Sequence, residues 1–257
     1  MMSKIYTKEE VIGLVSSCFK KRECEKLYKA ECINYTGETK DTKENYSKVI
    51  VDYLVEHIDE FKKGLSKIKV TRKDPYKTKS HNGISDFNFN KRPKGERREE
   101  KIAHAMYCQY KGKPAVFGKI LDYQVPLKNT SEDKGLGKID LLSVKNGSKP
   151  KSKKIYFLEL KKDYLEDDSK ETLLRCVLEA YTYSQIIDKE KLCADFNLPL
   201  EKEDNNEFII APLVYKDNHF ENQLEFVKPL INALDTPVEI FVWGYKAGKY
   251  TIESMKK

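Results

Sequence analysis

The sequence predicts an α/β fold, in which a central mixed sheet is flanked by helices and preceded by an α-helical N-terminal region. Two apolar runs on either side of a lysine-rich loop, within 137–162, are typical of a strand hairpin. The segment 167–188 has apolar residues at helical spacing, and the nearly all-apolar NEFIIAPLVY at 206–215 indicates a strand covered on both faces. At 257 residues and 39% hydrophobic content, the chain can bury a sizeable core.

Composition excludes several classes of protein. No apolar run approaches the length of about 18 residues that a membrane-spanning helix needs. The first residues, MMSKIYTKEEVIGLVSSCFKK, carry charge on both sides of a short apolar stretch, so we interpret them as a helix rather than a signal peptide. The six cysteines are irregularly spaced without a CxxC pair, which favours reduced thiols and a cytoplasmic location. A zinc site at Cys24 and Cys32 is a less favoured alternative.

The region 1–65 is expected to be helical. Thr7 with Glu10 three residues later forms a capping-box pattern at the start of a first helix. A second helix is expected over 43–65 and could end at Gly64. Its apolar residues stand at helical spacing: Val49, Tyr53, Leu54 and Ile58. These helices would pack on the main domain.

The segment 66–95 has no clear period and is expected to be a basic connection. From Lys67 to Arg98 there are eleven Lys or Arg residues against three Asp or Glu. Three aromatic residues lie among them: Tyr76, Phe87 and Phe89. Cations interleaved with aromatic rings suit a phosphate backbone and unstacked bases, so Arg72, Lys73 and Arg92 are candidate nucleic-acid contacts. A solvated linker is the alternative.

The region 96–257 is expected to form the main domain. Its elements, in order, are a helix at 96–110, one bent strand or a pair at 115–127, strands at 137–146 and 153–162, a long helix at 167–188, a strand at 206–215, a helix at 222–234 and closing strands at 237–255. Asp168 and Glu171 stand at capping-box spacing before the long helix. Pro229 argues for a kink or a break in the later helix.

The hairpin carries charges that a buried strand ordinarily avoids. If the two runs pair antiparallel with Leu142 opposite Phe157 and Val144 opposite Ile155, then Asp140 lies opposite Glu159 on the same face. Lys161 falls on that face as well. Converging carboxylates at a sheet end are hard ligands suited to Mg²⁺ or Mn²⁺, and a nearby ammonium could orient an attacking water. A structural ion pair is the alternative.

The string Asp140–x18–Glu159–Leu160–Lys161 resembles the signature of the PD-(D/E)xK nuclease superfamily, and the element order over 96–215 is similar to its restriction endonuclease-like core. Ile139 stands where the superfamily's name has Pro. The resemblance implies that Asp140, Glu159 and the Leu160 carbonyl bind the metal and that Lys161 assists the water. It also implies a Glu on the preceding helix. Of Glu96, Glu99 and Glu100, helical projection favours Glu99, with Glu100 second.

The predicted function is therefore a Mg²⁺-dependent nuclease that hydrolyses phosphodiester bonds of nucleic acid, with DNA expected as the substrate rather than RNA. The resemblance also suggests a role in bacterial defence or DNA processing. Lys138, Lys149 and Lys151 of the hairpin could contact phosphates. Arg175 begins a row with Glu179 and Tyr183 that either approaches the phosphate or is an ordinary surface ion pair. The rival functions are an inactive nucleic-acid binder on the same scaffold and a protein-interaction subunit. A homodimer is left open.

Overall fold

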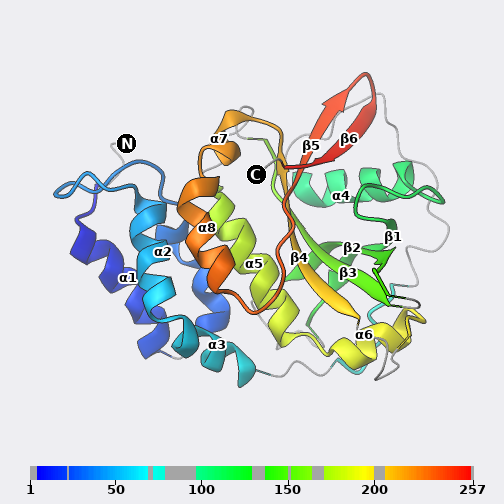
Figure 1. Cartoon of the computed structure of the whole chain (residues 1–257), viewed down its shortest axis with the longest axis horizontal. Helices are drawn as coiled ribbons and strands as arrows, with labels where there is room; N and C mark the ends of the chain where they lie inside the picture. The colour runs from blue at the N-terminus through cyan, green and yellow to red at the C-terminus, as the bar shows by residue number, and fades with distance from the viewer. Residues whose placement is uncertain are drawn as a thin grey trace.

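The computed structural model of the chain has one mixed sheet with helices on both of its faces (Figure 1). The α/β class predicted from the sequence is confirmed. The structure describes residues 5–21, 23–68, 72–78, 97–128, 137–149, 152–163, 171–199 and 206–255.

The six strands of the sheet lie in the order of their sequence. They are β1 (Lys119–Pro126), β2 (Lys138–Asn146), β3 (Lys153–Leu160), β4 (Glu207–Tyr215), β5 (Phe241–Lys246) and β6 (Lys249–Ser254). The first three strands and the last two are antiparallel neighbours, whereas β3, β4 and β5 run parallel. Parallel neighbours need a crossover, and the segments from 161 to 206 and from 216 to 240 provide them.

Helices cover both faces of the sheet. They are α1 (Lys8–Lys20), α2 (Tyr46–Glu56), α3 (Ile58–Ser66), α4 (Arg98–Gln109), α5 (Leu173–Ile186), α6 (Lys189–Asp195), α7 (Asn218–Glu221) and α8 (Leu224–Ala233), with short 3₁₀ helices at Cys24–Lys29 and Glu31–Asn34. In Figure 1, α5, α8 and the N-terminal helices lie on one side of the strands and α4 on the other. No helix among the described residues is both long and apolar enough to cross a membrane.

Alternation along β3 divides the buried residues into two cores. Ile155 and Phe157 pack into the larger core with α5, α8 and the N-terminal helices, while Tyr156 and Leu158 pack into the smaller core with α4. The N-terminal helices therefore share their apolar core with the main domain. The capping box predicted for the first helix is present, because the Thr7 hydroxyl accepts from the Glu10 N–H and the Glu10 carboxylate accepts from the Thr7 N–H.

The single helix expected over 43–65 is wrong. The chain forms α2 and α3 instead, with a break at His57, whose backbone leaves helical geometry (φ −111°, ψ 24°). The carbonyl of Tyr53 accepts from the His57 N–H at 3.1 Å and also lies 3.0 Å from Nδ1 of the His57 ring. Gly64 does not end the helix but lies inside α3, where the absence of a Cβ leaves room for the Cys24 side chain.

Two further helix boundaries differ from the expectation. The long helix begins at Leu173, and its N-cap is Thr172, whose hydroxyl accepts from the Arg175 N–H at 3.1 Å. Glu171 therefore precedes this helix instead of lying in its first turn, and Asp168 lies outside the described residues. The later helix, α8, continues through Pro229, whose missing N–H leaves one carbonyl of the preceding turn without its usual helical donor.

The expected bent strand at 115–127 is one strand, β1, with an irregular register between Ile120 and Asp122. Gln124 in β1 has φ +50°, a left-handed conformation that is uncommon for a residue with a side chain. This bend lies beside the start of β2, where the charged residues of the hairpin are found.

Candidate active site

The predicted register of the hairpin is confirmed. Leu142 lies opposite Phe157 and Val144 opposite Ile155, and the ladder continues to Leu141 opposite Leu158, one step before Asp140 and Glu159. Asp140, Glu159 and Lys161 are 7%, 4% and 2% exposed, so all three charges are buried. They lie at the carboxyl end of β3, where the sheet changes from antiparallel to parallel pairing.

Lys161 bridges two carboxylates. Its ammonium donates to Glu159 Oε1 at 2.7 Å and to Glu179 Oε2 on α5 at 2.9 Å. Its backbone is fixed to two further strands, because its N–H donates to the Leu213 carbonyl and its carbonyl accepts from Trp243 Nε1, both at 3.0 Å. Burial works to lower the pKa of Lys161, but the two carboxylates outweigh it and hold that pKa well above its usual value.

Asp140 is held on both oxygens. Its Oδ1 accepts from the Gln124 side-chain amide, and its Oδ2 accepts from the Leu160 N–H at 2.8 Å. Burial, followed by the nearby carboxylate of Glu99, raises the pKa of Asp140 to about 7. This side chain therefore changes its charge near neutral pH.

Glu159 keeps one oxygen, Oε2, that is buried and has no hydrogen-bond partner among the described residues. Burial first, and then the carboxylates of Asp140 and Glu179, raise the pKa of Glu159 well above its usual range. An orphaned buried oxygen beside a second carboxylate fits a divalent cation, which would supply the missing partner and offset the repulsion. The side chain of Leu160 is buried in the smaller core, so it could contribute only its backbone.

No ready-made ligand set is present in the described part of the chain, where no three His, Cys, Asp or Glu side chains are gathered as a metal-binding group. The described hydrogen bonds explain why these carboxylates do not meet. The Lys161 ammonium lies between the carboxylates of Glu159 and Glu179, and the Gln124 amide occupies one oxygen of Asp140. A cation between Asp140 and Glu159 would have to replace some of these contacts.

The first turn of α4 brings Glu99 to the site. Glu99 Oε1 accepts from the Lys162 N–H at 3.2 Å, and the buried ion pair between Arg98 and Asp163, at 3.0 Å, holds this turn against the chain that follows β3. Glu100 pairs instead with Arg97 at 2.6 Å. A hollow of about 280 Å³ opens here, and its lining includes Glu99, Glu100, Gln124 and Asp140.

The row of Arg175, Glu179 and Tyr183 on α5 is more than a surface ion pair. Glu179 and Tyr183 are 7% and 3% exposed, and the Tyr183 hydroxyl donates to Glu179 Oε1 at 2.7 Å. Although burial disfavours the charged form, donation from Lys161 and Tyr183 holds the pKa of Glu179 below its usual value. Arg175 donates to Glu171 at 2.9 Å and lies 3.7 Å from Glu179.

Several contributors were not assigned from the sequence. Gln124, Tyr28 and Trp243 contact the cluster from other elements of the chain, and no local pattern marks them. Asp163, two residues after Lys161, was not assigned either, and it pairs with Arg98. Glu179 was noticed in the sequence only because Arg175 and Tyr183 stand four residues before and after it, at helical spacing.

The candidate phosphate contacts are dispersed. Lys138 is exposed at the start of β2, two residues from Asp140. Lys149 is exposed in the hairpin loop, and the six residues from Asp140 to Asn146 place that loop about 20 Å from the carboxylates. Arg72 is engaged with the carbonyls of Lys128 and Pro75.

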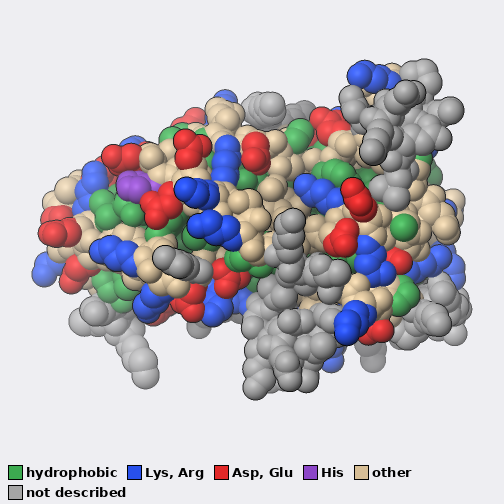
Figure 2. Space-filling view, turned by 90° about the horizontal axis from the view of Figure 1, so that it is seen from below, with side chains coloured by type: hydrophobic (Ala, Val, Ile, Leu, Met, Phe, Trp, Pro, Cys, Tyr) green, Lys and Arg blue, Asp and Glu red, His purple; other side chains and the backbone are tan. Residues whose placement is uncertain are grey.

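Further candidates need correction or lie elsewhere. Lys73 is exposed, whereas Arg92 and Lys151 lie outside the described residues, as do Phe87 and Phe89. Tyr76 is fully buried with its hydroxyl accepting from the Asp188 N–H, so the expectation that its ring stacks on bases is wrong. On the face drawn in Figure 2, Lys and Arg side chains are interspersed with Asp and Glu.

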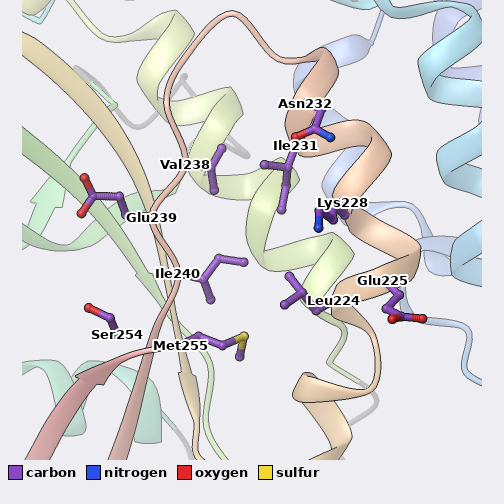
Figure 3. Close-up of a pocket in the computed structure, with 10 residues that line it drawn as sticks. All are labelled: Leu224, Glu225, Lys228, Ile231, Asn232, Val238, Glu239, Ile240, Ser254 and Met255. Carbon is purple, nitrogen blue, oxygen red and sulfur yellow. The ribbon is translucent and has the colours of Figure 1, made fainter. Parts of the chain in front are cut away.

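A second hollow, of about 360 Å³, lies between α8 and the segment leading into β5 (Figure 3). Leu224, Ile231, Val238, Ile240 and Met255 make most of its wall apolar. None of the charged residues around Lys161 lines it.

Comparison of the chain with protein-family models, with curated proteins and with solved structures finds no match. The resemblance to the PD-(D/E)xK superfamily therefore rests on the sequence motif and the expected order of elements alone.

Proposed function

We propose that this protein is a Mg²⁺- or Mn²⁺-dependent nuclease whose core is of the restriction endonuclease-like type. One observation carries the proposal: Glu159 and Glu179 are buried on the single ammonium of Lys161, the buried carboxyl of Asp140 lies close enough to raise the pKa of Glu159, and Glu159 keeps an oxygen without a partner among the described residues. Grouping buried carboxylates opposes folding, and clusters of this kind are concentrated at functional sites.

Asp140 and Glu159 would hold the cation, with Glu99 and the Leu160 carbonyl as further ligands. When bound, the cation lowers the pKa of a coordinated water and neutralises charge on the phosphate. Lys161 orients the attacking water and stabilises the negative charge that develops on the scissile phosphate. Glu179 holds Lys161 from the side opposite Glu159, and Trp243 fixes its backbone.

The expected substrate is nucleic acid, and DNA is favoured over RNA. Contacts from exposed lysines such as Lys138 carry no base code, so we expect weak intrinsic sequence preference. A role in bacterial defence or DNA processing and a homodimeric state are part of the proposal by analogy of fold alone.

The test is cleavage of labelled single- and double-stranded DNA and RNA in Mg²⁺, Mn²⁺ or EDTA. Wild type is compared with Lys161→Ala and with Lys216→Ala, which removes a lysine from an exposed ion pair with Glu253. We expect metal-dependent cleavage by wild type and Lys216→Ala and none by Lys161→Ala. Equal cleavage by all three proteins would refute the assignment.

A non-catalytic nucleic-acid binder is the second candidate, and one observation favours it: both Asp140 oxygens and the Lys161 ammonium already have protein partners. This candidate predicts salt-sensitive binding that persists in EDTA and in Lys161→Ala, without cleavage. A protein-interaction subunit predicts no salt-dependent binding of nucleic acid.

A further inference from the structure

A chain of hydrogen bonds connects the N-terminal helical region with the charged cluster. Tyr28, in the 3₁₀ helix Cys24–Lys29, is 1% exposed, and its hydroxyl lies 3.1 Å from the hydroxyl of Tyr183. Tyr183 donates to Glu179 Oε1 at 2.7 Å, and the other oxygen of Glu179 accepts from Lys161 at 2.9 Å. Four buried side chains thus lead from the N-terminal region to the candidate catalytic lysine.

The direction of these hydrogen bonds follows from proton counting. A tyrosine hydroxyl carries one proton, and the proton of Tyr183 goes to the carboxylate of Glu179. The contact between the two tyrosines can then form only if Tyr28 donates to Tyr183. Both tyrosine hydroxyls therefore donate towards Glu179, an arrangement in which successive hydrogen bonds strengthen one another. The Lys161 ammonium donates to Glu179 from the other end of the chain.

The Tyr183 side chain lies against two other parts of the chain, the 3₁₀ helix with Tyr28 and the segment at Gly137. The rings of Tyr28 and Tyr183 pack edge to face with centroids 5.6 Å apart. Gly137, at the start of β2, lies so close that a Cβ there would overlap the Tyr183 hydroxyl. The N-cap of α5 is also tied to the N-terminal region, since Thr172 donates to the Ile33 carbonyl at 2.7 Å.

We propose that Tyr28 is a positioning residue of the active site, which acts through Tyr183 and Glu179 to fix the place of the Lys161 ammonium relative to Glu159. The N-terminal helical region is then part of the site. The catalytic meaning of this inference rests on the proposed nuclease function, whereas the linkage between Tyr28 and Lys161 can be measured without any substrate.

The difference in hydrogen bonding between the carboxylates of Glu179 and Glu159 supports this role. Glu179 receives hydrogen bonds from both Lys161 and Tyr183, while Glu159 receives one from Lys161 and keeps Oε2 unpartnered. The tyrosine chain thus anchors Lys161 to Glu179 and leaves Glu159 the carboxylate with an oxygen to offer.

The first arm of the test is proton NMR of the metal-free protein, with the Tyr183 hydroxyl and Lys161 ammonium resonances assigned by their loss in Tyr183→Phe and Lys161→Arg. The variant is Tyr28→Phe. Its matched control is Tyr46→Phe, which removes another buried hydroxyl of the N-terminal region, one that accepts from the Tyr6 N–H at 2.9 Å. We expect both resonances to shift in Tyr28→Phe and to stay in place in Tyr46→Phe.

Unchanged resonances in a folded Tyr28→Phe would overturn the proposal. If Tyr28→Phe does not fold, 3-fluorotyrosine at position 28 keeps the shape and strengthens the donor, and it must shift the same resonances. The second arm is cleavage kinetics, in which loss of one hydrogen bond of the chain is expected to lower kcat about threefold to tenfold with KM unchanged.

The two arms separate the proposals. Shifted resonances in a protein that cleaves nothing would support the linkage and refute the nuclease function. Cleavage with equal kcat in Tyr28→Phe and Tyr46→Phe would support the nuclease function and refute the positioning role.

Discussion

Removing the Lys161 ammonium is the perturbation for which the structure gives the clearest magnitude. In Lys161→Met, the carboxylates of Glu159 and Glu179 remain buried without the cation that bridges them at 2.7 and 2.9 Å. Loss of one partner from a buried ion pair costs about 3 to 5 kcal/mol. Because one ammonium serves two carboxylates and is 2% exposed, we expect the upper half of this range at pH 8.

The loss should depend on pH with a definite sign. Burial and the neighbouring carboxylates already hold the pKa of Glu159 above its usual value of 4.5, and without Lys161 the pKa of Glu179 loses the contacts that lower it most and is expected to rise. When the pKa of a carboxyl is higher in the folded than in the unfolded state, the free energy of unfolding falls as pH rises from the unfolded-state pKa towards the folded-state pKa. The deficit of Lys161→Met is therefore expected to be smallest near pH 4.5 and to grow towards pH 8.

The assay is urea unfolding followed by tryptophan fluorescence. Trp243 is the single tryptophan of the chain, and its indole donates to the Lys161 carbonyl, so the probe lies at the perturbed site. Lys216→Met is the control, because its exposed ion pair should contribute about 0.5 kcal/mol or less. A loss below about 1 kcal/mol at pH 8, or a loss that grows on acidification, would refute the reasoning about the buried cluster.

Three other predictions concern the same cluster. Because the pKa of Asp140 is raised from 3.8 to about 7, the stability that its protonated form contributes is present below pH 3.8 and lost by pH 7. In urea titrations, Asp140→Asn should therefore be roughly 1 to 3 kcal/mol more stable than wild type at pH 8 and no more stable than wild type at pH 3.5. Gly137→Ala should cost about 1 to 3 kcal/mol by overpacking, whereas Gly13→Ala, in open space on α1, should gain about 0.5 to 1 kcal/mol; equal thermal unfolding of the two would contradict the close approach of Gly137 to Tyr183. Glu99→Gln should weaken Mn²⁺ binding at least about tenfold in electron paramagnetic resonance titrations, and Glu100→Gln, which removes the charge that pairs with Arg97, should leave it unchanged; equal losses would remove Glu99 as the helix ligand.

Local rules were sufficient for the hairpin. Side chains alternate between the two faces of β2 and β3, so a shift of one residue would separate the apolar residues and the charges of one strand from those of the other. The predicted register, with Leu142 opposite Phe157, is the one that the structure has. The order of the elements that were predicted after residue 96 followed for the same reason, since apolar periodicity is a local property, whereas the short helices α6 and α7 were not predicted.

The partners of the charges could not be found by local rules. Tyr28 and Tyr183 are 155 residues apart in the sequence, and their contact depends on how the N-terminal region packs on α5. The N-cap at Thr172 likewise depends on side-chain hydrogen bonds, one of them to the Ile33 carbonyl of the N-terminal region. Tyr76 was interpreted as a ring that could stack on bases, but it is buried in the core. The sequence of a basic segment does not show which of its rings face the core.

The central claim is that the buried cluster around Asp140 binds a divalent cation and cuts nucleic acid. The most direct measurement is single-turnover cleavage in Mg²⁺ by wild type, Asp140→Asn and Glu100→Gln, each checked for folding by urea titration. The account predicts cutting by wild type and Glu100→Gln, and none by Asp140→Asn although it is at least as stable as wild type. Cutting by folded Asp140→Asn at the wild-type rate would contradict it.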